Sequence, residues 1–297
     1  MTAVSRAASR PLRRRAKRRR LARRLVINLL GALVFVVMTF PVYWMVSTAF
    51  KPGNDIVSYT PKWFPIPATL ENFTDAIHRD YFWQNVKNSL LVVCCVVGLA
   101  LALGFLAALA LARFHFYGRR AFLVCILCVL LVPLNALIIP LFIMLSDTPV
   151  LHLSLVNTLT GLVVVYLMFV LPFTVWVLRG FLDGVPQELE EAAMVDGSSR
   201  FGAFCRILLP LVAPGLVATS IFAFIQAWNE FILAYVLLRS PEKQTLTIWL
   251  ASFTTARGTD WGPLMAAATL TAIPVVVFFV LVHRRIAFGL TAGGVKG

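Results

Sequence analysis

The sequence predicts an all-α, polytopic membrane protein with six transmembrane helices. Of its 297 residues, 60% are hydrophobic and only 13% are charged. This is too apolar for a soluble domain, in which about half of the residues at most are apolar. The apolar residues also gather in runs long enough to cross a bilayer, which takes about 20 residues. One membrane domain accounts for the length of the chain, so we expect residues 25–297 to form a single transmembrane domain.

Six apolar runs predict the spanning helices. The second run has neither charges nor prolines, whereas the third contains Pro133 and Pro140, the fourth Pro172 and the sixth Pro274. Prolines within spanning helices mark kinks, because they remove a backbone hydrogen bond. The predicted spans are Leu25–Phe50, Leu90–Leu111, Ala121–Leu145, Leu159–Leu178, Leu211–Leu238 and Met265–Val282.

The net charge of +14 is concentrated in residues 1–24. This segment has eleven Lys and Arg and no acid, which leaves sixteen Lys and Arg against thirteen acids in the rest of the chain. A basic tail can bind nucleic acid, but this one directly precedes a spanning segment. We therefore expect a disordered cytoplasmic tail that sets the topology and contacts anionic membrane lipid, and no nucleic-acid partner.

The distribution of Lys and Arg predicts that both termini are cytoplasmic. The tail, the 113–120 loop, the 179–210 loop and the C-terminal segment together hold twenty Lys and Arg, whereas the loops on the opposite side hold seven. Cytoplasmic loops are the positive ones. On the opposite side, the loop that begins at Arg239 contains Trp249, Phe253 and Trp261, which we interpret as part of an interfacial aromatic belt.

The segment Arg179–Pro214 is the most charged interruption between the later apolar runs. Its ionised side chains would each cost several kcal/mol in hydrocarbon, so it must fold outside the membrane. The pattern predicts two short helices. Asp196-Gly197 forms the turn between them, Ser198 or Ser199 caps the second helix, and Pro210 ends it. From the residues alone, this hairpin either packs on its own membrane domain or presents a docking surface to another protein.

The spacing within this segment resembles the EAA loop of ABC importer permeases, and the whole of residues 25–297 is similar to the carbohydrate-class permease subunits. The resemblance implies the type I ABC importer permease fold, a multi-pass location in the bacterial plasma membrane, and a role for residues 179–210 in coupling to a cytoplasmic ATPase. The residues that match the loop are Glu191, Ala192, Ala193, Asp196, Gly197, Ile207, Leu209 and Pro210.

The resemblance also implies partners. They are a second permease subunit, which it favours as a different chain, two cytoplasmic ATPase subunits that hold ATP and Mg, and an extracytoplasmic sugar-binding protein. The chain itself has no phosphate-binding G-x-x-x-x-G-K-[ST] motif. Its four histidines are scattered, and the pair Cys125 and Cys128 lies within an apolar run. We therefore expect no enzymatic activity, no cofactor and no metal site in this chain.

Polar residues also occur inside the predicted fifth span, at Gln226, Asn229 and Glu230, beside Trp228. A carboxylate within a membrane faces a cavity or a partner group. These four residues line a translocation path, or the polar ones form a clamp between helices or between subunits. A secondary transporter or channel that needs no ATPase is the alternative function. A membrane-embedded enzyme would require more clustered ionisable residues than Glu230 alone provides.

Overall fold

The computed structural model describes the backbone of residues 4–147 and 154–292, and the side chains of residues 23–282 apart from 135 and 148–153. These residues form two compact units, Met1–Phe73 with Trp261–Thr269, and Thr74–Asp260 with Leu270–Gly297. The α-helices are α1 Val4–Ala49, α2 Gly53–Ile56, α3 Glu71–His78, α4 Phe82–Arg113, α5 Arg119–Leu131, α6 Ile138–Ser146, α7 Leu159–Asp183, α8 Glu188–Val195, α9 Arg200–Ala203, α10 Leu209–Asn229, α11 Ile232–Leu237, α12 Leu246–Ala251 and α13 Trp261–Ala292.

Short irregular elements complete the fold. Leu134–Leu137 (η1) and Pro241–Lys243 (η3) are 3₁₀ turns, and Phe204–Leu208 (η2) is a π-helical turn. A small antiparallel hairpin pairs β1 Thr254–Thr255 with β2 Gly258–Thr259. The helical class that the sequence predicts is therefore confirmed, with this hairpin as a minor addition.

Five helical stretches in the described part of the chain are long and apolar enough to span a membrane. They are Arg23–Ala49, Phe82–Arg113, Leu159–Asp183, Arg200–Asn229 and Trp261–Val282. Each overlaps one of the six predicted spans, namely the first, second, fourth, fifth and sixth. The backbone of α1 continues back to Val4 through the basic segment, where the sequence analysis expects a disordered tail. Arg, Lys, Leu and Ala all favour the helix, and they continue an apolar helix without a break.

The third predicted span is not one helix. It is divided into α5, the turn η1 and α6, with the break at Val132 and Pro133. Val132 has an extended backbone, at φ −73° and ψ 124°, because the ring of a proline disfavours the helical conformation in the residue before it. Pro140 lies in the first turn of α6, where its missing N–H group has no partner to lose.

The fifth predicted span also ends early. Helix α10 stops at Asn229, Glu230 has an extended backbone at φ −68° and ψ 129°, and the chain resumes as the short helix α11. The sequence analysis continues this span to Leu238 because apolar residues run on through α11. Their pattern carries no sign of the break.

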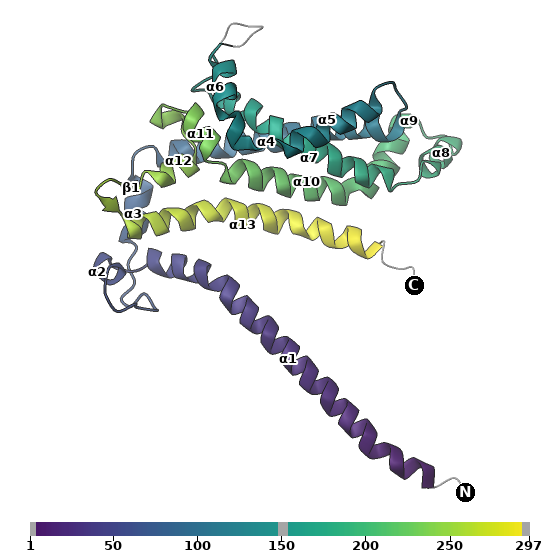
Figure 1. Ribbon diagram of the computed structural model, residues 1–297, viewed down its shortest axis with the longest axis horizontal. Helices are drawn as coiled ribbons and strands as arrows, with labels where there is room; N and C mark the ends of the chain where they lie inside the picture. The colour runs from purple at the N-terminus through teal and green to yellow at the C-terminus, as the bar shows by residue number, and fades with distance from the viewer. Residues whose placement is uncertain (1–3, 148–153, 293–297) are drawn as a thin grey trace. The chain divides into compact units, whose positions relative to one another are not determined.

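Within the second unit, α4 packs along α7, and α10 packs on both (Figure 1). Small residues permit the close approach of these helices. A Cβ added at Gly104 of α4 would lie 2.7 Å from Cγ2 of Thr174 in α7. A Cβ added at Gly215 of α10 would lie 2.6 Å from Cγ of Phe181, also in α7. The buried cluster at this end of the bundle comprises Phe105, Ala108, Leu111, Ala112, Ile126, Val175, Leu178, Leu182, Leu208 and Val212.

The segment that precedes the β-hairpin is a packed substructure rather than an interfacial belt. Trp249 and Phe253 are only 3% and 1% exposed. The indole Nε1–H of Trp249 donates to the backbone oxygen of Asp80 at 3.0 Å, and its ring lies 5.0 Å from that of Phe82. The predicted aromatic belt is therefore wrong for these two residues, because contacts distant in sequence bury them. Trp261 is 49% exposed.

Candidate functional site

The α8–α9 hairpin, Glu188–Ala203, has local geometry that its sequence explains closely. Three acids, Glu188, Glu190 and Glu191, occupy the first turn of α8, near the positive end of the helix dipole. Gly197 follows α8 with φ +90°, the left-handed conformation that favours glycine. The predicted turn at Asp196-Gly197 is confirmed.

Backbone hydrogen bonds close the end of α8 in a complete Schellman motif. The amide of Ser198 donates to the oxygen of Ala193 at 2.9 Å, and the amide of Gly197 donates to that of Met194 at 3.1 Å. Helix α9 then begins at Arg200, and the hydroxyl of Ser199 caps it by accepting a hydrogen bond from the amide of Gly202 at 3.0 Å. This hairpin turn therefore satisfies its own backbone groups and leaves the tip free to contact another molecule.

The outer surface of the α8–α9 hairpin is apolar at several positions. Val195 is 87% exposed and Phe201 is 74% exposed. Beside α8 is a groove of about 460 Å³, whose lining includes Arg113, Glu191 and Met194. Such an exposed apolar surface marks a protein contact more often than a solvated face.

Arg113, the last residue of α4, holds the hairpin to the bundle. Its guanidinium Nε and Nη2 both lie 2.8 Å from Oε1 of Glu190 in α8. The two Nη groups donate to the backbone oxygens of Leu182 and Val185, each at 3.1 Å. One planar side chain thus joins the end of α4, the end of α7 and the first turn of α8. The sequence analysis did not identify this residue, and only a lone arginine at the end of an apolar run could have indicated it.

The eight residues that match the EAA loop fall into two groups in the structure. Those in the tip are exposed, except for Ala193, which is half-buried: Glu191, Ala192, Ala193, Asp196 and Gly197. Those in η2 and at the start of α10 are Ile207 and Leu209, which are half-buried, and Pro210, which is exposed. The fully buried anchor of this second group is Leu208, which lies in the cluster beneath the hairpin.

Pro210 does not end the helix that follows the turn, as the sequence analysis expects. The helix continues from Arg200 to Asn229 through the π-helical turn η2, in which the amide of Leu209 donates to the oxygen of Phe204. The wider π turn relieves the clash that the ring of Pro210 would make with the preceding turn.

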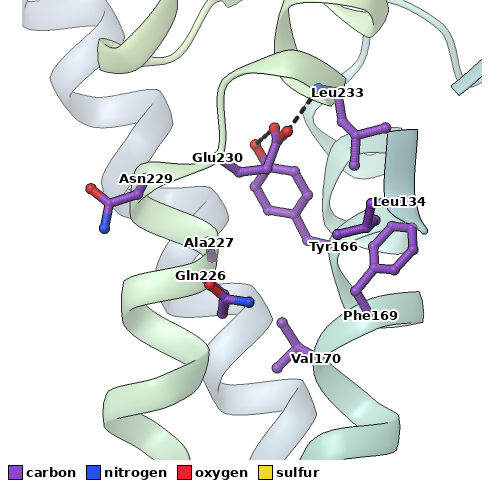
Figure 2. Close-up of a pocket in the computed structure, with 9 residues that line it drawn as sticks. All are labelled: Leu134, Tyr166, Phe169, Val170, Gln226, Ala227, Asn229, Glu230 and Leu233. Atoms are coloured by element: carbon purple, nitrogen blue, oxygen red, sulfur yellow. Dashed lines mark hydrogen bonds between the residues drawn. The ribbon is translucent and has the colours of Figure 1, made fainter. Parts of the chain in front are cut away.

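The polar residues at the end of α10 surround a cavity of about 170 Å³ between α7, α10 and η1 (Figure 2). Gln226, Asn229 and Glu230 line it, together with Tyr166 of α7. Trp228 does not. It is 7% exposed, and its ring stacks on that of Phe224 at a centroid distance of 5.6 Å.

Glu230 has three hydrogen-bond partners of its own. The hydroxyl of Tyr166 donates to its Oε2 at 2.7 Å, and the amides of Leu233 and Ala234 donate to Oε1 at 2.8 Å and Oε2 at 3.0 Å. The last two amides belong to the first turn of α11, which otherwise lacks acceptors. Figure 2 shows the carboxylate meeting the Tyr166 hydroxyl, while the Asn229 side chain points away from both. The geometry therefore favours the clamp interpretation for Glu230.

No cluster of metal ligands occurs among the described side chains. Within that part of the chain, no three of the His, Cys, Asp and Glu residues come together as a metal site would require. Cys125 and Cys128 are free and exposed on α5. The expectation of a chain without its own metal site stays a prediction.

Several apolar helices of bilayer length, with an exposed helical hairpin between two of them, define a multi-pass membrane protein. Residues 100–291 match the family model of the binding-protein-dependent transport system inner membrane component. The chain belongs to this family, and it is therefore an inner-membrane transport protein. The resemblance drawn from the residues of the α8–α9 hairpin is confirmed.

Related proteins match over most of their length. The diacetylchitobiose uptake system permease protein DasC of Streptomyces coelicolor is 46% identical over 270 residues, covering 91% of this chain and 96% of DasC. The trehalose transport system permease protein SugB of Mycobacterium tuberculosis is 33% identical over 270 residues, covering 90% of this chain and 96% of SugB.

A solved structure shares the fold. The crystal structure of a bacterial ABC transporter involved in the import of the acidic polysaccharide alginate superimposes with a TM-score of 0.74 at 21% identity. The match covers 88% of this chain and 95% of that one. The importer permease fold that the resemblance implies is confirmed.

Proposed function

We propose that the chain is the transmembrane permease subunit of an ATP-driven sugar importer. The observation that carries this function is the exposed and fully capped α8–α9 hairpin, with the EAA-loop residues at its tip, in a member of the importer permease family. The names of DasC and SugB support a sugar as the solute. An ATPase-independent channel or secondary transporter would have no use for a hairpin with these residues.

The α8–α9 hairpin is the coupling element of this proposal. Its tip, with Glu191 and Gly197 exposed, docks on a cytoplasmic ATPase subunit, and the apolar side chains of Val195 and Phe201 are covered on docking. ATP and Mg bind the ATPase subunits and not this chain. Closure of the ATPases moves the hairpin. Two connections pass that motion to the bundle: the guanidinium of Arg113, which joins α8 to α4 and α7, and the continuous helix Arg200–Asn229.

The assembly we propose contains a second permease subunit of a different chain, two ATPase subunits and an extracytoplasmic sugar-binding protein. Both termini and the α8–α9 hairpin are cytoplasmic in this assembly, as the Lys and Arg count predicts. Membrane lipid surrounds the bundle, and nucleic acid has no part in it. One half of a solute path lies at the end of α10, where Gln226 and Asn229 offer exposed amides and Glu230 and Trp228 hold the helices in place.

Transport by the reconstituted complex tests this function. Proteoliposomes that contain the chain, its partner permease, the ATPase subunits and the binding protein are loaded with ATP and given labelled diacetylchitobiose or trehalose, the solutes in the names of the two relatives. We expect uptake of a sugar only with hydrolysable ATP. Uptake that continues with an ATPase subunit unable to hydrolyse ATP would support the channel or secondary transporter instead.

The coupling role has a separate test in the same vesicles. Glu191→Lys reverses the charge of an exposed side chain, so it should not disturb folding. We expect ATP hydrolysis without sugar uptake in this variant. Normal uptake by Glu191→Lys would contradict docking through the tip, even if the sugar-importer function holds.

A further inference from the structure

The first unit contains a cavity of about 410 Å³ that the proposed function does not use. It lies where α1 ends, and the segment up to Lys62 and the start of α13 complete its walls. The side chains that matter for its chemistry are those of Trp44, Thr48, Lys51, Asp55, Lys62 and Trp261.

The walls of this cavity are held in place by hydrogen bonds. Asn72, which is 7% exposed, donates from Nδ2 to the backbone oxygens of Ala49 at 2.9 Å and Lys51 at 2.8 Å. The amide of Thr69 donates to the oxygen of Phe50 at 2.9 Å. The chain therefore leaves α1 in one fixed direction, and a ligand would meet a preformed site.

The cavity carries an excess positive charge. Lys51 is 2% exposed, and its ammonium lies 3.9 Å from the centre of the Trp44 ring. The carboxylate of Asp55 is already paired with Lys62, whose Nζ lies 2.6 Å from Oδ1. Two ammonium groups thus face one carboxylate. Burial lowers the pKa of Lys51, and the carboxylate of Asp55 offsets only part of this effect. A buried cation in this situation is stabilised by a further anion.

A second group in the wall also lacks a partner. The hydroxyl oxygen of Thr48 is buried without a hydrogen bond to any described residue, and Thr48 is 6% exposed. Buried hydroxyl groups in native proteins are nearly always paired, so an unpaired one indicates a missing ligand or water. Thr48 and Lys51 both line the cavity and are three residues apart.

The cavity lies at the level of lipid headgroups. The apolar span Arg23–Ala49 ends two residues before Lys51. Aromatic side chains cluster around the same level, with the Trp44 and Trp63 rings 5.8 Å apart and the Tyr43 hydroxyl donating to the Trp63 oxygen at 2.6 Å. Tyr and Trp gather at the membrane–water interface. This position holds whichever side of the membrane the end of α1 faces.

We propose that this cavity binds the phosphate of an anionic phospholipid headgroup. The phosphate accepts hydrogen bonds from the ammonium of Lys51 and the hydroxyl of Thr48, and Lys62 lies nearby with its side chain 46% exposed. The glycerol part of the headgroup packs against the indoles of Trp44 and Trp261, and the acyl chains follow the apolar side chains of α1. An anionic lipid is preferred over a zwitterionic one, because a choline group would bring another cation to a cavity that is already positive.

Lipid titration of the purified full-length chain tests this proposal. Dioleoylphosphatidylglycerol or dioleoylphosphatidylcholine is added in mixed micelles, and bound lipid is counted by native mass spectrometry. We expect phosphatidylglycerol to bind, and Lys51→Met to weaken its binding at least about tenfold. Lys87→Met, which removes the same charge near the start of α4 and outside the cavity, should bind as the unchanged protein does.

A second variant keeps the test decisive if Lys51→Met does not fold. Thr48→Val preserves the shape of the side chain and removes only the unpaired hydroxyl, so the protein should fold and bind phosphatidylglycerol severalfold more weakly. Unchanged binding in both variants would overturn the proposal. Binding of glycerol 1-phosphate as tight as that of phosphatidylglycerol would overturn the lipid as its source, and would indicate a site for a soluble phosphate.

Discussion

Removal of the Arg113 side chain should release the α8–α9 hairpin from the bundle. Arg113→Ala breaks the ion pair with Glu190 and leaves the backbone oxygens of Leu182 and Val185 without their donors. The Arg113 and Glu190 side chains are 11% and 20% exposed, so solvent replaces these bonds only in part. Hydrogen bonds to charged groups contribute about 1.5–3 kcal/mol, and breaking a buried pair costs about 3–5 kcal/mol.

Because the bonds of the Arg113 guanidinium are only partly shielded from solvent, we expect their loss to reduce the free energy that holds α8 in place by about 2–3 kcal/mol. That loss multiplies the population of the released hairpin by roughly 30- to 150-fold. Amide hydrogen exchange in residues 188–195 should accelerate by a similar factor, because local opening controls the exchange. Arg113→Lys should give an intermediate rate, since an ammonium cannot reproduce the fork.

Arg120→Ala is the matched control, because it removes the same charge from an exposed residue in the first turn of α5, outside the lining of the groove beside α8. Exchange in α8 that stays within about twofold of the unchanged protein in Arg113→Ala would refute the anchoring role. The exchange experiment needs no partner subunits, so its result is independent of the proposed coupling to an ATPase. In the full complex, we expect Arg113→Ala to hydrolyse ATP with little sugar uptake.

Other substitutions probe single features of the fold and site. Gly197→Pro should uncouple uptake from ATP hydrolysis, because proline cannot adopt the φ of +90° and the Schellman turn is lost; intact membrane insertion with normal uptake would contradict this. Glu230→Ala should lower stability by about 1–2 kcal/mol, because α11 loses the carboxylate that caps its first turn. If Glu230 only holds the helices together, Glu230→Gln should leave the substrate preference of the transporter unchanged in uptake assays. In denaturation experiments, Gly104→Ala should lower the free energy of unfolding by about 1–3 kcal/mol, because the added methyl group meets α7. Its control is Gly98→Ala, whose methyl group meets nothing within 4 Å, so this variant should be neutral or slightly stabilising. The pKa of Lys51 is lowered in the folded chain, so between that pKa and 10.5 the unfolded chain binds more protons than the folded chain. The free energy of unfolding therefore rises with pH across this window. Melting curves of Lys51→Met from about pH 8 to about pH 10 should lack the rise in stability that Lys51 contributes.

The sequence alone determined those parts of the protein that depend on neighbouring residues. The turn at Asp196-Gly197, the Ser199 cap and the acids of α8 follow from local rules on glycine conformation, capping and the helix dipole. Five spanning helices follow from apolar runs, because hydrocarbon requires every backbone group to be paired within the helix. The family follows from the spacing of residues in one loop.

Only the tertiary structure decided features that join distant segments. Arg113 meets Glu190 across 77 positions, and Tyr166 meets Glu230 across 64, so neither pair leaves a pattern in a short window of sequence. The same holds for Trp249, which looks like an interfacial residue until its contact with Asp80 is known. Local propensity fixes where a helix turns or caps, whereas the partner of a buried polar group depends on which helices pack together. Which helices pack together depends on contacts along the whole chain.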